Sequence, residues 1–125
     1  MRWYLRSKIH HARVTDVNLH YAGSITIDET LLDTAGFEEG ELVQVWDVTN
    51  GERFETYIIP GTRDSGIMGL NGAAARRVML DDTIIIAGFE LSDFPVSPRV
   101  VLVDERNHIK QMISETNGEE VESEL

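Results

Sequence analysis

The stretch LHYAGSITID, residues 19–28, contains the first residues whose types suggest chemistry. Gly23-Ser24 interrupts a run that otherwise alternates like a β-strand, and no Pro, Asn or second Gly completes an ordinary turn. Glycine inside a strand usually marks a bulge, a turn or a close backbone approach. The pair therefore predicts that the backbone departs from an ordinary strand directly beside a serine hydroxyl.

Two groups of charged and aromatic residues have spacings that place them on shared strand faces. Lys8 and His10 are two residues apart on a presumed strand. Further along, Arg53, Glu55 and Tyr57 share one face of a second strand, and Thr56 takes the other. Such residues are mostly solvent-exposed in proteins, so spacing alone favours two solvated faces over a binding site.

A glycine-rich segment, GIMGLNGAAARR at residues 66–77, precedes a predicted short helix. Backbone N–H groups at such a point suit an anion, either phosphate or carboxylate. The segment lacks the Lys-Ser/Thr of a P-loop and does not match G-x-G-x-x-G, which argues against a nucleotide. A small carboxylate ligand and a purely structural tight turn both remain open.

The four histidines do not suggest a metal site. The rings of His10 and His11 should point to opposite faces of a strand, and the other two lack a recognisable ligand spacing. A triad of Ser24 with a His and an Asp is a further alternative, but there is no G-x-S-x-G elbow. The sequence therefore predicts no metal and no conventional serine hydrolase.

Short strands dominate the elements that must position these residues. Asn50-Gly51 joins two alternating runs over 41–61 and predicts a hairpin with a type I′ turn. Residues 81–91 form a nearly continuous β-branched run typical of a buried strand, and a second hairpin is expected around 105–107. Short helices are expected over 28–37, between an Asp28 N-cap and Gly36, and over 71–80. The pattern predicts a small closed β-barrel.

Composition limits the partners and the setting. The chain has 125 residues and a net charge of −11, with 11 Lys and Arg against 22 Asp and Glu, which argues against nucleic acid or an anionic membrane. Residues 115–125 hold five Glu and no base, so we expect a single domain over 1–114 and an acidic, disordered tail over 115–125. No apolar run could span a membrane, and the absence of Cys favours the cytoplasm.

Four segments together resemble the bacterial aspartate 1-decarboxylases, pyruvoyl-dependent enzymes that convert L-aspartate to β-alanine for pantothenate synthesis. They occur in the family's order and spacing: LRSKIH at 5–10, LHYAGSITID at 19–28, NGERFETY at 50–57 and LNGAAARR at 70–77. The resemblance runs from about Leu5 to Gly88, and residues 91–125 carry little of it. Asp64 is a departure, because many relatives have Gly there.

The resemblance implies that the chain is an inactive proenzyme that cleaves itself between Gly23 and Ser24. Ser24 Oγ would attack the Gly23 carbonyl, with Thr56 donating to the oxyanion, and Asn71 near the group that forms. The products would be a β-chain, 1–23, and an α-chain, 24–125, with Ser24 converted to a pyruvoyl group. A maturation factor is a possible partner in this step, and the sequence does not identify one.

The resemblance also implies how the mature site works. The pyruvoyl group would form a Schiff base with L-aspartate and act as electron sink in place of pyridoxal phosphate. Tyr57 would be the proton donor, since a phenol is protonated at neutral pH. The remaining implied residues bind substrate (Lys8, Arg53, Thr56, Gly72, Ala73, Ala74) or line the pocket (His10, Tyr21, Trp46).

The implied fold is mainly β: a small closed six-stranded double-psi β-barrel with two or more short helices, assembled as a homotetramer with active sites between neighbouring subunits. Two other hypotheses remain at this point. Residues 29–48 also resemble the swapped-hairpin barrels of DNA-binding transition-state regulators, although the excess of acidic residues argues against DNA. The other is a catalytically inactive barrel used as a binding module.

Overall fold

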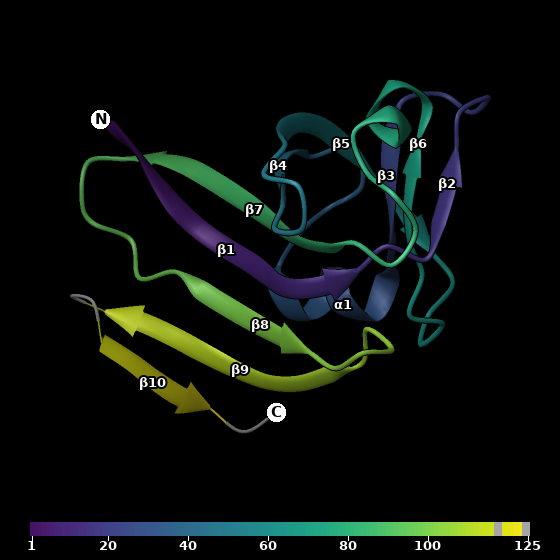
Figure 1. Ribbon diagram of the computed structural model, residues 1–125. Helices are drawn as coiled ribbons and strands as arrows, with labels where there is room; N and C mark the ends of the chain where they lie inside the picture. The colour runs from purple at the N-terminus through teal and green to yellow at the C-terminus, as the bar shows by residue number, and fades with distance from the viewer. Residues whose placement is uncertain (117–118, 124–125) are drawn as a thin grey trace.

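A computed structural model describes residues 1–116 and 119–123 of the chain. In this part of the chain, ten strands form one mixed sheet in the order β10-β9-β8-β1-β7-β4-β5-β3-β6-β2 (Figure 1). The strands are β1 (Arg2–Arg13), β2 (Asp16–Asn18), β3 (Ser24–Asp28), β4 (Leu42–Asp47), β5 (Arg53–Gly61), β6 (Met68–Asn71), β7 (Thr83–Ser92), β8 (Arg99–Val103), β9 (Ile109–Thr116) and β10 (Glu119–Ser123). The mainly β prediction is confirmed.

Both predicted short helices are present. Helix α1 (Glu29–Ala35) begins after Asp28, whose carboxylate accepts a hydrogen bond from Thr30 N, and ends at Gly36 in the left-handed conformation. This is the N-cap and C-terminal stop that the sequence predicts. The Ala-rich segment forms the 3₁₀ helix η1 (Gly72–Arg76), a single short turn directly after β6.

The hairpin of β4 and β5 is confirmed, but the type I′ turn at Asn50-Gly51 is wrong. Such a turn needs positive φ at both central residues, and only Gly51 has it, at +81°. The connection is longer, over 48–52, because Asp47 Oδ1 accepts hydrogen bonds from Thr49 N and Asn50 N at 2.8 and 3.1 Å. The side chain of Asp47 thus provides the turn that the dipeptide was expected to provide.

Strand β7 runs through the centre of the molecule between β1 and β4. Its side chains Ile84 and Ile86 are fully buried and pack with Ile9, Val45 and other aliphatic residues in one core cluster. The expectation of a buried β-branched strand is thus confirmed for the middle of β7, while its last residues are half-buried or exposed. Helix α1 packs beside β1, β3 and β8 (Figure 1).

The two adjacent histidines do not point to opposite faces of β1, contrary to the prediction. A bulge between Ile9 and Ala12 gives His11 a φ of +60°, and the two imidazole rings stack with centroids 3.9 Å apart. The bulge breaks the two-residue alternation on which the prediction rested. No group of three or more metal-binding side chains occurs among the residues that the structure describes.

The C-terminal hairpin of β8 and β9 is confirmed, with its turn over 104–108. Within the expected tail, residues 115–116 belong to β9 and Glu119–Ser123 to β10, while 117–118 and 124–125 lie outside the described residues. Where it is described, this segment therefore has strand backbone. The division into a domain over 1–114 and a disordered tail stays a prediction.

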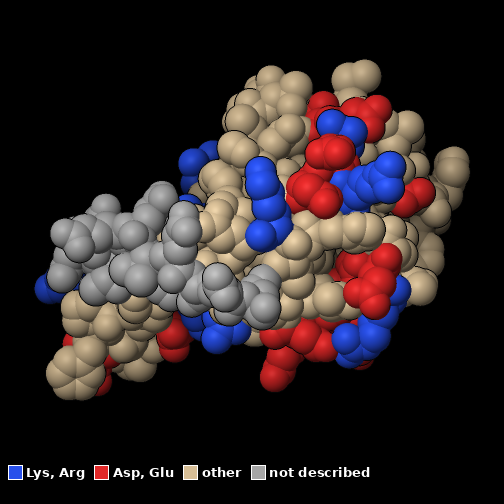
Figure 2. Space-filling model, turned by 90° about the horizontal axis from the view of Figure 1, so that it is seen from below, with Lys and Arg blue, Asp and Glu red and all other residues tan. Residues whose placement is uncertain are grey.

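Acidic and basic side chains alternate over the face shown in Figure 2. Among the described residues, Arg63 bridges Glu29 and Asp33, and Arg77 pairs with Glu52. On this face the described residues do not form the continuous basic stripe that binding to a DNA backbone requires. No helix in the described part of the chain is long and apolar enough to cross a membrane.

Candidate active site

Ser24 is the first residue of β3, and it is fully buried. Its hydroxyl donates a hydrogen bond to the carbonyl oxygen of Ala22 at 3.1 Å and accepts one from Asn71 Nδ2 at 2.9 Å. A serine that the sequence singles out thus has no access to solvent and is held from two sides. A buried, oriented hydroxyl suits a reaction within the chain better than attack on an external substrate.

Asn71 reaches Ser24 because β3 and β6 are antiparallel and place the two residues directly opposite each other. The Asn71 side chain is 7% exposed, and the same Nδ2 also donates to Thr26 Oγ1 at 3.0 Å. Sequence reasoning named Asn71 but missed Thr26. Thr26 is two residues after Ser24 and therefore on the same strand face, and this spacing could have identified Thr26 as a site residue.

Gly72 brings the start of η1 into contact with the peptide that precedes Ser24. Its φ is +62°, and a Cβ atom built there would lie 2.7 Å from both Gly23 Cα and Gly23 N and 2.8 Å from the carbonyl oxygen of Tyr21. Only glycine fits this position. The structure therefore brings together four predicted residues, Gly23, Ser24, Asn71 and Gly72.

Tyr57 lies beside this group. Strands β3 and β5 are parallel with Ile25 opposite Ile58, so Tyr57 occupies the position next to Ser24 and on the same face. Its side chain is 41% exposed. Thr56 is on the other face of β5, paired with the buried Val43, and its role as an oxyanion donor stays a prediction.

The predicted substrate-binding cations lie elsewhere on the sheet. Arg53 stacks its guanidinium 4.3 Å from the ring of Trp46, at the start of β5 and four residues before Tyr57. Lys8 pairs with Ala87 on β1, four strands from Ser24 in the order β1-β7-β4-β5-β3. At about 4.8 Å per strand this is roughly 19 Å when followed along the sheet in this direction.

The remaining predicted residues divide between these regions. Ala73 and Ala74 follow Gly72 in η1, the first exposed and the second buried, and Tyr21 precedes the Gly-Ser pair with its side chain half-exposed. His10 and Trp46 belong to the Lys8 and Arg53 region, on β1 and β4. In the strand order, the Lys8 region on β1 is therefore separate from the Ser24 region on β3 within one chain.

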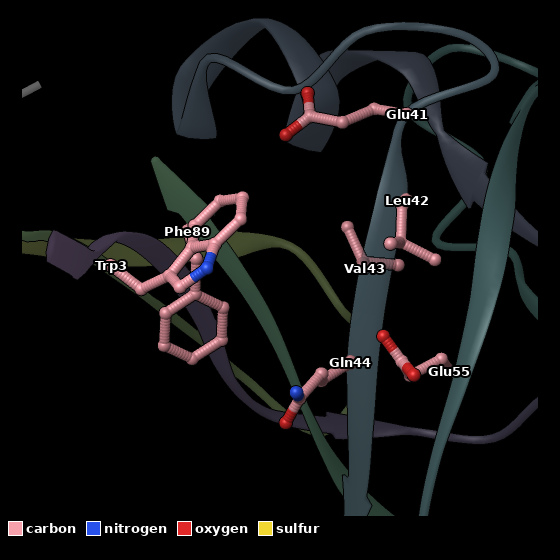
Figure 3. A pocket seen from close by; sticks show the side chains of 7 residues that line it. All are labelled: Trp3, Glu41, Leu42, Val43, Gln44, Glu55 and Phe89. Atoms are coloured by element: carbon pink, nitrogen blue, oxygen red, sulfur yellow. The ribbon is translucent and has the colours of Figure 1, made fainter. Parts of the chain in front are cut away.

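A cavity of about 640 Å³ on the outer face of the sheet is not the predicted site. Figure 3 shows the aromatic rings of Trp3 and Phe89 facing β4, with Glu41 above the cavity and Glu55 on β5. None of the predicted site residues lines it. Two carboxylates in its wall would repel a dicarboxylate substrate.

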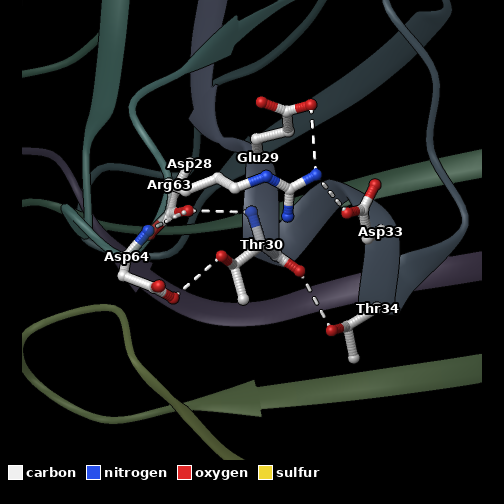
Figure 4. Close-up of polar contacts among 7 residues, drawn as sticks. All are labelled: Asp28, Glu29, Thr30, Asp33, Thr34, Arg63 and Asp64. Atoms are coloured by element: carbon white, nitrogen blue, oxygen red, sulfur yellow. Dashed lines mark hydrogen bonds and ion pairs between the residues drawn. The ribbon is translucent and has the colours of Figure 1, made fainter.

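The end of β3 opposite Ser24 is fixed by Asp28, which is 1% exposed. Besides capping α1, its carboxylate accepts hydrogen bonds from Asp64 N at 3.0 Å and Gly66 N at 2.9 Å (Figure 4 shows the bonds to Thr30 and Asp64). Asp64, which replaces the glycine expected from the resemblance, adopts a φ of +60° and accepts from Thr30 Oγ1. Asp64 therefore adopts the left-handed backbone conformation that a glycine would adopt there, and the turn is kept.

Comparison with known proteins decides the family. A sequence model described as "Aspartate decarboxylase" matches residues 1–110. The chain belongs to the aspartate decarboxylase family. The match also extends beyond Gly88, where the resemblance was expected to fade, and includes β8 and the turn that follows it. The hypothesis of a DNA-binding module is therefore wrong.

Individual relatives are similar over most of their length. The chain is 49% identical over 119 residues to an aspartate 1-decarboxylase of Exiguobacterium sibiricum, covering 92% of this chain and 94% of that one. It is 50% identical over 114 residues to one of Burkholderia vietnamiensis, covering 87% and 89%. A third, of Anoxybacillus flavithermus, is 50% identical over 116 residues, covering 90% and 91%.

Proposed function

We propose that the chain is an aspartate 1-decarboxylase that converts L-aspartate to β-alanine and CO2, a cytoplasmic step toward pantothenate. The observation that supports this most directly is the buried Ser24 hydroxyl beside Gly23, held by Asn71, in a member of the aspartate decarboxylase family. Such a hydroxyl is placed for reaction with its own backbone. Before that reaction, with Gly23 and Ser24 joined, the chain is the proenzyme.

Self-cleavage begins at the Ser24 hydroxyl. Its oxygen bonds to the carbonyl carbon of Gly23, the C–N bond breaks, and the hydroxyl proton ends on the nitrogen of Ser24. The resulting ester loses a proton from Cα of Ser24 and breaks the Cβ–Oγ bond, which leaves a carboxylate on Gly23. Water then replaces the nitrogen of the dehydroalanine, which leaves as ammonia, and residue 24 becomes a pyruvoyl group.

The residues around Ser24 fit a pyruvoyl group at that position. Asn71 Nδ2 already donates to Ser24 Oγ and is a donor suited to a carbonyl oxygen in its place. Such a group supplies an electron sink for the charge left when the substrate loses CO2. No metal and no pyridoxal phosphate is needed for this chemistry.

Tyr57 holds the proton that replaces the lost carboxyl group. It lies beside Ser24 on the same sheet face, and its partly exposed phenol is open to a substrate. Gly72, which lies against Gly23, and the following Ala73 and Ala74 contribute backbone N–H groups to the substrate. Thr56 assists at the carbonyl of Gly23 during cleavage.

Lys8 and Arg53 bind the substrate carboxylates from a second copy of the chain. Two observations support this: Lys8 is four strands from Ser24 in the strand order, and the Arg53 guanidinium stacks on Trp46 of its own copy. The same face exposes large apolar side chains, Trp3 at 68% and Leu42 at 63%, which a second copy would cover. His10, Trp46 and Tyr21 line the pocket formed in this way, in a homotetramer.

The fold that accompanies this function is a closed six-stranded double-psi β-barrel. Parallel pairs β1-β8, β2-β6 and β3-β5 within a mostly antiparallel sheet support such a topology. The strands that carry the predicted site, β1, β3, β4, β5, β6 and β7, would form the barrel. The terminal strands β8, β9 and β10 would extend it.

The test is intact mass spectrometry of the purified chain, combined with an assay for β-alanine. Two chains separated between Gly23 and Ser24, the larger resistant to N-terminal sequencing, are expected together with aspartate-dependent β-alanine. Ser24→Ala should remain one chain without activity. A wild-type chain that stays intact and inactive, even after heating, would contradict the proposal and favour an inactive binding barrel.

A further inference from the structure

We propose that Thr26 is a positioning residue for self-cleavage: its hydroxyl holds the Asn71 side-chain amide in the orientation that presents an N–H to Ser24. The inference rests on the proposed function. It concerns how the reacting hydroxyl is oriented, and it assigns a role to a residue that was not among the predicted site residues.

Asn71 uses one nitrogen for two contacts. Its Nδ2 lies 2.9 Å from Ser24 Oγ and 3.0 Å from Thr26 Oγ1. A side-chain amide carries two hydrogens on that nitrogen, so both can be engaged at once. An amide with both hydrogens bound cannot turn about its last torsion without breaking two hydrogen bonds, whereas an amide held only by Ser24 breaks one.

Thr26 is itself fixed by the strands on either side. It pairs with Gly69 on β6 and with Ile59 on β5. A Cβ atom built on Gly61 would lie 3.0 Å from the Thr26 methyl group, and one built on Gly69 would lie 3.7 Å from Thr26 Cβ. Two glycines thus make room for a β-branched side chain, whose χ1 is stiff. With the methyl group beside Gly61, the hydroxyl is directed to Asn71.

The contacts of Ser24 show why this orientation matters. A serine hydroxyl has one hydrogen and two acceptor lone pairs. The hydrogen goes to the carbonyl of Ala22, and one lone pair accepts from Asn71. The second lone pair is then left for the carbonyl carbon of Gly23. If the Asn71 amide turns, its oxygen faces Ser24, competes with Ala22 for the hydroxyl hydrogen and changes the direction of the attacking lone pair.

The experiment follows the rate of self-cleavage of the full chain by intact mass spectrometry. Thr26→Val keeps the shape of the side chain and removes the hydroxyl, and cleavage is expected to slow about tenfold, the effect of losing one hydrogen bond. Thr26→Ser keeps the hydroxyl and should cleave within about threefold of wild type. Thr34→Val, which removes a threonine hydroxyl from α1, is the matched control and should leave the rate unchanged.

A purely structural role is distinguished by a double-mutant cycle. If Thr26 acts through Asn71, adding Thr26→Val to Asn71→Ala should not slow cleavage further. Thermal unfolding of each variant is the control, and it should show that all of them are folded. If the valine variant is insoluble, Thr26→Ala gives the same comparison.

Cleavage of Thr26→Val at the wild-type rate would overturn the proposal, and so would an equal slowing in the Asn71→Ala background. Wild-type protein that never separates between Gly23 and Ser24 would instead contradict the proposed function, so the two failures are distinguishable.

Discussion

At the scale of single residues, the candidate site depends on atoms that approach one another very closely. Gly72 lies against the backbone of Gly23, and Asn71 binds Ser24 from the same short segment between β6 and η1. The backbone that precedes the reactive serine is therefore shaped by residues almost 50 positions later in the chain.

Gly72→Ala is expected to abolish self-cleavage. A methyl group at this position would lie within 3 Å of three backbone atoms, and alanine is strained at a φ of +62°. The backbone at Gly23 must therefore shift. Mass spectrometry should show one uncut chain, and Ala73→Gly, at the exposed next position, is the control that should still be cut. Normal cleavage of Gly72→Ala would contradict the close contact.

Tyr57→Phe separates maturation from turnover. The variant keeps the aromatic ring beside Ser24 and loses the phenol proton, so it should cleave into two chains but decarboxylate aspartate at least 100-fold more slowly. The measurement is kcat for β-alanine formation after complete processing. Unchanged kcat would remove Tyr57 as the proton donor, whereas failure to process would show that it acts earlier.

At the scale of elements, buried carboxylates hold strand ends and turns in place. Asp28 joins the end of β3 to α1 and to the loop over 62–66, and Asp47 closes the β4-β5 turn. Both accept hydrogen bonds from backbone N–H groups of these segments. Asp28 thus fixes the end of β3, which carries Ser24, and Asp47 fixes the turn before β5, which carries Tyr57.

Asp28→Ala should destabilise the protein by about 2–4 kcal/mol, because three N–H groups lose their acceptor at a buried site. The matched control is Asp33→Ala on the same helix, which removes an exposed carboxylate from the Arg63 pair and should cost less than about 1 kcal/mol. Urea unfolding measures both. If Asp28→Ala and Asp33→Ala lower the free energy of unfolding equally, the three hydrogen bonds of Asp28 do not contribute to stability as proposed.

Asp47 should make stability depend on pH. Burial, and then the neighbouring Asp82, raise the pKa of Asp47 from 3.8 to about 6, and Asp47 Oδ2 is buried without a hydrogen-bond partner. The folded state thus holds a proton that the unfolded chain releases between pH 4 and 6. The stability contributed by protonated Asp47 is complete below pH 4 and is lost as the pH rises through 6.

Asp47→Asn tests this directly, since an amide stays neutral and its oxygen can still accept from the turn. Between pH 4 and pH 7, the free energy of unfolding of the wild type should fall by on the order of 2–3 kcal/mol more than that of the variant. Urea titrations at several pH values measure it. Glu105→Gln, on the exposed C-terminal turn, should follow the wild-type profile. Parallel profiles for wild type and Asp47→Asn would contradict the raised pKa.

At the scale of the whole molecule, we expect the proposed site to be formed by two copies of the chain. Ser24 and Tyr57 are neighbours on β3 and β5, whereas Lys8 is on β1 and the Arg53 guanidinium stacks on Trp46. Cations are required to bind a dicarboxylate in a protein of net charge −11, so neither group suffices alone.

Complementation between inactive variants tests the shared site. Ser24→Ala and Lys8→Ala should each be inactive, but co-expression should restore about a quarter of wild-type activity, because sites that combine an intact Ser24 with an intact Lys8 then form by chance. Light scattering should show tetramers. No restored activity in proven mixed tetramers would place Lys8 and Ser24 in the same copy.

Local chemistry could be predicted from the sequence, because it depends on neighbours in the chain. The cap at Asp28, the stop at Gly36, the strand nature of most segments and the Gly23-Ser24 pair are properties of a few adjacent residues. Resemblance over four short motifs was enough to name the family.

Contacts between distant segments were decided by the tertiary structure alone. The two-residue period of a strand does not reveal a bulge, so the stacking of His10 on His11 was missed, and a side chain that closes a turn overrode the Asn-Gly signal. Strand pairing placed Asn71 on Ser24 and separated Lys8 from it. These outcomes depend on how strands far apart in sequence align, and sequence spacing carries no information about that alignment.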